Sequence, residues 1–260
     1  MSKTLTFAPL LATILLANIG FAQKQEGVIT FESKINMHRT IKFGGDNAEQ
    51  MKAMMPEYRT SKMVLYFNEN ESLYKAPEAK EEDDENQDIN GGGNGVRMKF
   101  NTPKNEIYVN TAQSKKIELN DMFGKKFLIE DSLKTPKWKI ETDIKKVAGF
   151  DCMKATLKTT GEKPQNIVAW FTSDISCASG PNYVGLPGMI LEINIDEGLQ
   201  AYTAQSIDFR KLKSDELKAP SGGKKVSQAE YKKIREDRLK ELGMPANGGG
   251  GAIKMIIKND

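Results

Sequence analysis

The feature of this sequence that most constrains its fold is a succession of short segments, each either alternating between apolar and polar residues or forming a brief apolar run between turn residues. These segments lie at 28–37, 63–67, 72–75, 96–100, 106–110, 115–119, 127–130, 138–141, 152–159, 167–172, 189–195 and 202–209. A period of two is typical of strands with one buried face. Strands that follow one another without intervening helices favour an antiparallel sheet. We therefore predict a mainly β chain, built as a curved antiparallel sheet or a partly open barrel.

Two segments interrupt the strand pattern with helix signals. Asp46 followed by Glu49 resembles a capping box, and the helix that it would open must end before Pro56. A second Ser-x-x-Glu box begins at Ser227 and predicts a helix over 227–242. We expect a short N-terminal helix and a C-terminal helix, the latter against the sheet or its rim.

The N-terminus has the pattern of a signal peptide. Lys3 precedes an apolar run at 7–19, and the small residue Ala22 ends the segment. This order of charge, apolar core and small residue is typical of export signals. We predict a signal peptide at 1–22 and a single β-rich domain at 23–260, located in the periplasm or secreted. No later segment is long and apolar enough to predict a transmembrane anchor.

A polar stretch at 76–95 is unlike the rest of the predicted domain. It holds seven acidic residues and ends in a run rich in glycine. Such a composition buries too little apolar surface to offset the entropy of ordering, which favours a flexible loop. The alternative is a calcium site, because Asp88 lies in a spacing that resembles an EF-hand loop. Arg97, however, occupies the position of the bidentate glutamate.

The chain has two cysteines, Cys152 and Cys177, which are 25 positions apart. In an exported protein, a single pair of cysteines is first interpreted as a disulfide. Closing a loop of this length contributes roughly 3–4 kcal/mol in the chain-entropy model. The alternative is two separate buried thiols.

Composition argues against several classes of function. The 38 basic and 35 acidic residues nearly balance, which is unlike a dedicated nucleic-acid-binding protein. A single histidine and two cysteines make zinc sites and Ser-His-Asp or Cys-His catalysis improbable. Glycoside hydrolysis by a carboxylate pair stays open, although no carboxylate has a distinguishing context. We expect no enzyme activity and no cofactor.

The most distinctive segment is a glycine- and proline-containing motif between two predicted strands. Its residues are Gly185, Leu186, Pro187, Gly188, Met189 and Ile190. Proline presets φ at the first central position of a type II turn, and glycine supplies a positive φ at the second. The motif therefore predicts a rigid corner that leads the chain into the core. The alternative is a binding site formed by the polar residues that are near in sequence, which are Asp174, Asn182, Tyr183 and Glu192.

This motif resembles the sequence for which the GLPGLI family is named. The resemblance extends over about 138–195 and includes Trp138, the 149–155 stretch and the aromatic pair at 170–171; it departs from the family at Ser176. What it implies is a secreted or periplasmic protein of Gram-negative bacteria without an established activity. It supplies no catalytic residues to assign.

The leading hypothesis is a non-enzymatic exported envelope protein that binds a protein partner or an apolar ligand through its curved sheet. Open or closed antiparallel sheets commonly enclose a cavity. Aromatic residues that are candidates for lining such a cavity, or for ordinary core packing, are Trp138, Trp170, Phe171 and Tyr183. By analogy with the family, the partner is an outer-membrane transporter or another envelope protein.

The alternative hypothesis is a periplasmic protein that binds monovalent copper. Met51, Met54 and Met55 lie on the predicted short helix, and His38 lies upstream. Thioether and imidazole groups suit soft copper ions, and spacings of three and four residues share one helical face. The same methionines equally suit packing between helix and sheet.

Overall fold

The structure is a computed structural model, which describes residues 26–40, 48–53, 55–78, 89–90, 96–100, 104–122, 124–160, 164–241 and 253–257. The predicted signal peptide at 1–22 lies outside the described residues. So does most of the predicted flexible loop, of which only 76–78 and 89–90 are described. Within the described ranges, no helix combines the length and apolar character needed to span a bilayer.

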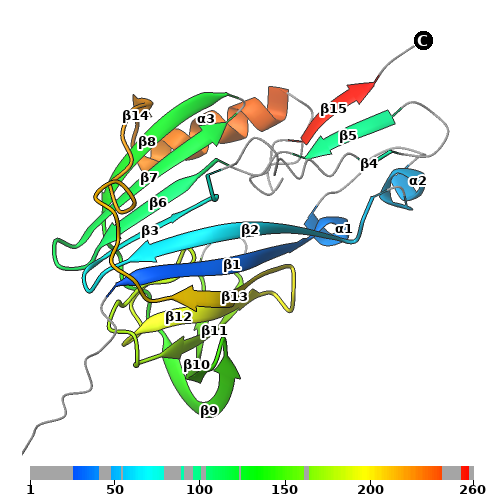
Figure 1. Cartoon of the computed structure of the whole chain (residues 1–260). Coiled ribbons are helices and arrows are strands. Elements are labelled where there is room, and N and C mark those ends of the chain that lie inside the picture. Colours follow the sequence, from blue (N-terminus) through cyan, green and yellow to red (C-terminus); the bar gives the residue numbers. More distant parts are fainter. Residues whose placement is uncertain are drawn as a thin grey trace, which may run out of the picture.

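The described strands form two sheets, of which one is large and curved (Figure 1). In order across the sheet, its strands are β14 (Lys224–Lys225), β8 (Lys125–Ser132), β7 (Lys115–Met122), β6 (Glu106–Asn110), β3 (Glu71–Lys75), β2 (Tyr58–Phe67), β1 (Gly27–Asn36), β13 (Gln200–Asp208), β12 (Met189–Ile195), β11 (Asn166–Thr172), β10 (Phe150–Lys158) and β9 (Lys139–Val147). Neighbouring strands are antiparallel, except that β14 pairs in parallel with β8. The end strands β14 and β9 do not pair with each other, so the sheet is open. The predicted curved antiparallel sheet is confirmed.

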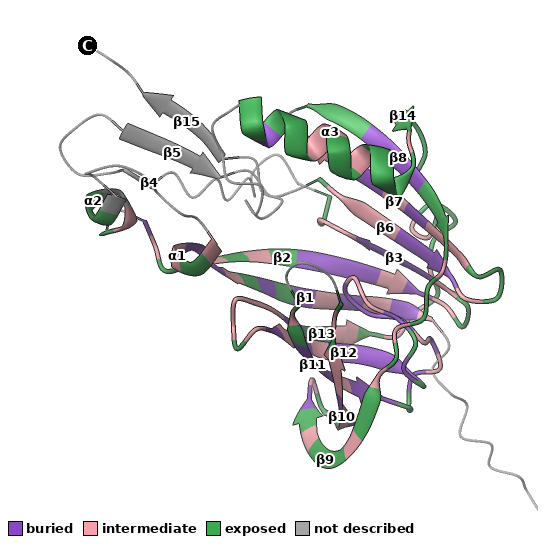
Figure 2. Cartoon of the chain, turned by 180° about the vertical axis from the view of Figure 1, so that it is seen from behind, coloured by how far each residue is buried: buried purple, intermediate pink, exposed green. Residues whose placement is uncertain are grey.

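A second, small sheet has the order β15 (Ile253–Ile257), β5 (Val96–Phe100), β4 (Ile89–Asn90). The helices are α1 (Met37–Thr40), α2 (Ala48–Ala53) and α3 (Gln228–Glu241). The expected short N-terminal helix and C-terminal helix are therefore both present, and α1 is an additional turn of helix. Helix α3 lies along β7 and β8 (Figures 1 and 2).

The strand register defines two faces of the large sheet. Leu65, Tyr74 and Ile107 are neighbours on β2, β3 and β6, and they share a face that we call the inner face. Tyr66 and Leu73 point to the opposite, outer face, because side chains alternate along a strand. Figure 2 shows the alternation as changes between buried and exposed residues along single strands.

The main core lies on the inner face, where strands from both halves of the sheet converge. Ile29, Leu65, Ala169 and Ile193 are fully buried there and belong to one apolar cluster. The segment 173–188, which connects β11 to β12, adds buried side chains to the same cluster. This segment therefore fills the space enclosed by the curved sheet.

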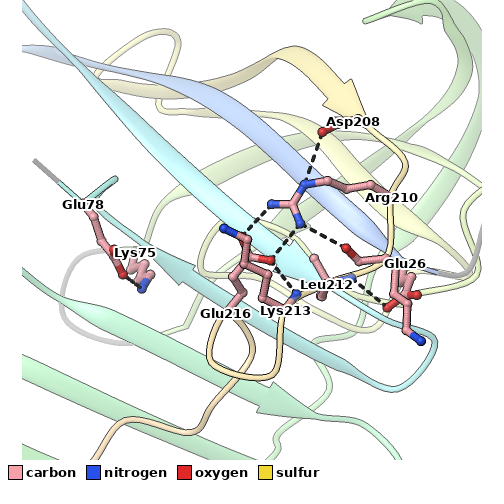
Figure 3. A network of polar contacts seen from close by, with 9 residues as sticks. Glu26, Lys75, Glu78, Asp208, Arg210, Leu212, Lys213 and Glu216 are labelled. Carbon is pink, nitrogen blue, oxygen red and sulfur yellow. Dashed lines mark hydrogen bonds and ion pairs between the residues drawn. The ribbon is translucent and has the colours of Figure 1, made fainter. Parts of the chain in front are cut away.

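The connection between β13 and β14 crosses the outer face and is fixed by an ion-pair network (Figure 3). Arg210 donates to both carboxylate oxygens of Glu216, at 2.7 and 2.6 Å, and its Nε lies 3.3 Å from Asp208. The backbone N–H of Leu212 donates to Glu26 at 3.3 Å. These contacts place Leu217 against the small apolar cluster of the outer face.

The predicted disulfide between Cys152 and Cys177 is wrong. Both cysteines are free, buried thiols in the inner core. The Cys152 Sγ lies 3.6 Å from the carbonyl oxygen of Phe150, and the Cys177 Sγ lies 3.8 Å from that of Glu71. Burial raises the pKa of the Cys152 thiol to about 11 and that of Cys177 to about 12. The two thiols therefore act as small apolar core residues with separate backbone contacts.

The predicted type II turn at the glycine-proline motif is also wrong. The Gly188 N–H donates to the carbonyl oxygen of Leu186 at 2.8 Å, which closes a three-residue γ-turn around Pro187. The fixed φ of proline suits the central position of an inverse γ-turn. The segment still delivers Met189 and Ile190 into the core, where both are fully buried.

Candidate functional site

A pocket of about 60 Å³ lies on the inner face, over β3, β6 and β7 and beneath two loops. Its lining residues are Ser72, Tyr74, Ile107, Val109, Lys116, Leu133, Lys134, Pro136, Gly180, Asn182, Tyr183 and Val184. The sheet register explains the strand part of this list: Ser72 pairs with Val109, and Val109 pairs with Lys116. The loops bring the remaining residues from positions that are distant in sequence.

The strand side of the pocket contains buried hydroxyl groups. Tyr74 is only 5% exposed, and its hydroxyl has no hydrogen-bond partner among the described residues. The Ser72 and Ser179 hydroxyls are 2.6 Å apart and satisfy each other. A buried polar group without a partner carries a desolvation cost. Because this hydroxyl is inaccessible to solvent, Tyr74 lines the pocket with its ring atoms.

The loop side of the pocket is held in place by side-chain hydrogen bonds. Asn182 has a left-handed backbone, with φ of 63°, and its Nδ2 donates to the Tyr202 hydroxyl at 2.8 Å. The Trp138 Nε1 donates to the carbonyl oxygen of Val184 at 2.9 Å. The Trp138 and Tyr183 rings also meet edge to face, with centroids 5.9 Å apart. These contacts indicate a preformed pocket.

Two lysines line the pocket, and each has an acidic partner. Lys116 Nζ lies 2.5 Å from Glu118, and Lys134 Nζ lies 3.5 Å from Asp131. The formal charges of these four side chains cancel. The rim is therefore polar without a net charge, and its ammonium and carboxylate groups can hydrogen-bond to a neutral ligand.

The tyrosines at the pocket keep their protons at neutral pH. Burial raises the pKa of Tyr183 to about 12 and raises that of Tyr74 well above its ordinary value. A hydroxyl in this state donates hydrogen bonds and does not act as a base. The protonated tyrosines therefore suit the pocket to binding a ligand.

The four aromatic residues predicted for a cavity or partner surface occupy different settings. Tyr183 lines the pocket, and Trp138 packs against it. Phe171 is fully buried in the core. Trp170 pairs with Glu192 on the outer face, and the Lys145 Nζ lies 4.5 Å from the centroid of its ring. The structure therefore brings together only two of the four.

The residues of the copper hypothesis are partly described. Met55 is buried, and the His38 Nε2 lies 2.9 Å from the Met55 carbonyl oxygen. Met54 and the side chain of Met51 lie outside the described residues. In the part of the chain that the structure covers, no group of three or more His, Cys, Asp and Glu side chains is placed to hold a metal ion. Copper binding stays a prediction.

Tyr74, Ser72 and Lys116 carry no signal in the sequence that marks them as site residues. In sequence they are ordinary members of alternating strands. Of the pocket residues, only Asn182 and Tyr183 carried a signal, because they flank the glycine-proline motif. The others become a site only through strand pairing.

The chain is similar to one protein family and to solved structures of PNGF-II. The model of the family described as "N-glycanase peptide, N-terminal domain" matches residues 84–233. Two solved structures of PNGF-II, in space groups P21 and C2, resemble the chain with TM-scores of 0.52 and 0.53 at 15% and 14% identity. Each match covers 81% of this chain and about a third of PNGF-II, 33% and 32% respectively. A comparison with curated proteins finds no match.

The match corrects the expected membership of the GLPGLI family. The residues behind that expectation include Gly149 and Gly185, both with positive φ, and Leu186, which is 2% exposed. Such residues specify turns and core packing. They indicate a curved β fold without identifying the family, and the family match shows a different one.

Proposed function

This chain belongs to the family of N-glycanase N-terminal domains, and on that premise we propose that it is a non-catalytic binding domain of an exported protein that handles glycans. It acts outside the cytoplasm, in the periplasm or after secretion. Its partner is a glycan-bearing protein, and the binding site is the pocket on the inner face of the sheet.

The observation that carries this proposal is the chemistry of the pocket lining. Protonated hydroxyls, an amide and balanced charges surround a small apolar space. Saccharides offer hydroxyl and carbonyl groups for the polar contacts and C–H surfaces for the apolar ones. The loop contacts of Asn182 and Trp138 preform the site, which lowers the entropic cost of binding.

The test compares an N-glycosylated protein with the same protein after enzymatic removal of its glycan, both immobilised for biolayer interferometry. We expect the chain to bind the glycosylated form at least 10-fold more tightly. Val184→Phe places a larger side chain at the pocket and should abolish this preference. Val168→Phe makes the same substitution on the outer face and should preserve it.

Equal binding to both forms, or binding unaffected by Val184→Phe, would show that the pocket is not the glycan site. Release of glycan from the test protein during incubation, detected by mass spectrometry, would overturn the non-catalytic assignment.

A further inference from the structure

The open edge of the large sheet at β9 carries apolar side chains on the face that forms the core. Among the described strands, β9 pairs with β10 alone (Figure 1). Ile140 pairs with Ala155 and Ile144 with Met153, so both isoleucines point to the inner face. Ala155 is fully buried and Met153 packs against the main core, yet the two isoleucines are 48% and 67% exposed. The apolar inner face therefore continues to the last strand and is uncovered there.

The outer side of β9 carries a row of charges, one of which lacks a close partner. Lys145 Nζ lies 2.6 Å from Glu192. Asp143 has one ion pair among the described residues: its Oδ2 lies 3.9 Å from Lys154 Nζ, which is closer to Glu141, at 3.0 Å. The Asp143 side chain is 58% exposed. Its carboxylate is therefore available to a cationic group that approaches the edge.

The pairing of β9 with β10 is regular along only part of the strand. From Ile144 to Val147 the register is unbroken, and it shifts between Ile144 and Ile140. A strand added at this edge would therefore pair with a short segment, through few main-chain hydrogen bonds. Such short pairing limits indiscriminate association and favours a partner that is also held elsewhere.

β9 begins beside the pocket of the inner face. Trp138, which directly precedes β9, packs against Tyr183 of the pocket lining and donates to the carbonyl oxygen of Val184. Ile140 follows two residues later, about 7 Å along an extended strand. A glycan in the pocket would hold the polypeptide that bears it near this edge, which raises the effective concentration of that polypeptide there.

We propose that β9 binds an extended polypeptide segment of the glycan-bearing partner as an added strand. The segment has a β-branched apolar residue opposite Ile144 and a lysine or arginine opposite Asp143. Main-chain hydrogen bonds to β9 supply affinity, and the alternating side chains supply selectivity. This inference rests on the proposed function for the source of the segment, and it goes beyond that function because it assigns a second surface, which contacts polypeptide.

Titration of the isotope-labelled full chain with a synthetic peptide, followed by NMR, tests strand addition without any glycan. The peptide has about ten residues in which valine alternates with threonine, and a lysine replaces the central threonine. We expect the amide signals of 144–147 to shift and those of β1 to stay in place. No shift, or shifts spread evenly over the sheet, would overturn the proposal.

Two N-methylated forms of this peptide separate main-chain pairing from side-chain contact. One form is methylated at the valine nitrogens and the other at the threonine nitrogens, and in a strand these two sets of N–H groups point to opposite edges. We expect one form to bind at least 10-fold more weakly than the parent peptide and the other to bind like it. Equal affinities of the two forms would overturn strand addition.

Ile144→Asp should lower the affinity for the peptide at least 10-fold, because a carboxylate would then face the apolar residue of the added strand. Tyr58→Asp is the matched control, since Tyr58 is also a large apolar residue with 40% exposure but lies on β2. It should leave the affinity unchanged. Equal losses in the two variants would place the peptide elsewhere.

Asp143→Lys tests the charge contact and does not depend on the stability of the variant, because two peptides are compared on the same chain. The affinity for the lysine peptide should fall about 3- to 5-fold, and that for a peptide with glutamate in place of the lysine should rise by a similar factor. An unchanged ratio of the two affinities would overturn the assigned contact.

The edge at β9 and the pocket are tested separately. If Val184→Phe abolishes the preference for the glycosylated protein but the peptide does not bind at β9, the strand inference is wrong and the glycan site stands. If the peptide binds at β9 but the glycosylated and deglycosylated proteins bind equally, the glycan site fails and the edge remains a peptide-binding surface.

Discussion

At the residue scale, Gly188 shows how one position fixes the path of the motif segment. Its φ is 142°, and a Cβ atom placed there would overlap the carbonyl oxygen of Thr172 on β11. Glycine is therefore required both for the backbone conformation and for the close approach of two chain segments. The corner holds Leu186 and Met189 in the core, so that strain at Gly188 would reach the apolar cluster.

We predict that Gly188→Ala lowers the free energy of unfolding by more than about 3 kcal/mol, because backbone strain and steric overlap add together. Gly198→Ala is the control: its φ of 87° is also positive, but nothing lies within 4 Å of a Cβ atom there. It should cost only about 1–2 kcal/mol. Urea denaturation measures both, and equal costs would contradict the steric argument.

Glu216 gives the outer-face connection a dependence on pH. The hydrogen bonds from Arg210 lower the pKa of this carboxyl group to about 2, compared with 4.5 for an unperturbed glutamate. The group stabilises the fold fully above the unfolded pKa. As the pH falls from about 5 toward 2, the unfolded state binds the proton more readily, and the stabilisation is lost.

Glu216→Gln should therefore be less stable than the parent chain at pH 7, and the difference should shrink as the pH is lowered toward 2. Thermal melts of both chains across this pH range provide the measurement. A difference that is independent of pH would mean that Glu216 acts through shape and not through charge.

At the scale of the element, α3 depends on a few contacts. Its Tyr231 ring packs against Phe127 of β8, with centroids 5.6 Å apart, and Leu239 is its buried residue. The predicted capping box is present, since Glu230 accepts from the Ser227 N–H at 2.7 Å and the Ser227 hydroxyl accepts from the Glu230 N–H at 3.2 Å. A helix of 14 residues is marginal on its own, so its docking decides its stability.

We predict that Tyr231→Ala speeds amide hydrogen exchange throughout 228–241 at least 10-fold while the exchange of β1 and β2 changes little. Local opening of the helix needs less free energy than global unfolding once its main aromatic contact is gone. Lys232→Ala, on the exposed side of the helix, should leave the exchange unchanged. Equal acceleration in helix and sheet would instead show that α3 and the sheet unfold as one unit.

The elements were more predictable from sequence than the site. The strand at 189–195 has the predicted bounds, because alternation and burial on one face leave a direct trace in sequence. The turn at Pro187 and the pairing of Cys152 depend on how separate segments pack, which local composition does not specify. Tyr74 was not predicted as a site residue for the same reason: its neighbours in the pocket come from strands and loops as far away as Val184.

At the scale of the whole molecule, the open sheet leaves two edges. The edge at β14 has two residues, whereas β9 has nine. On β9, Ile140 and Ile144 are 48% and 67% exposed, unusual for isoleucine. The pairing with β10 shifts register between these two residues, and Lys, Glu and Asp side chains alternate with them. A bulge and charges are features that limit unwanted pairing at a sheet edge.

The exposed isoleucines of β9 lead to a prediction about the self-association of the full chain in solution. Replacing Ile140 and Ile144 together by Thr keeps β-branched side chains on the strand and removes apolar surface from the edge. Because both residues are largely exposed, the free energy of unfolding should change by less than about 0.5 kcal/mol. Light scattering of concentrated samples should show less self-association for the double variant than for the parent chain, since a hydrophobic edge strand promotes self-association.

Asp143→Asn on the same strand is the opposite control: it removes a charge that protects the edge and should increase association. If the double variant lost substantial stability, the two isoleucines would instead be part of the core that holds β9 to the sheet.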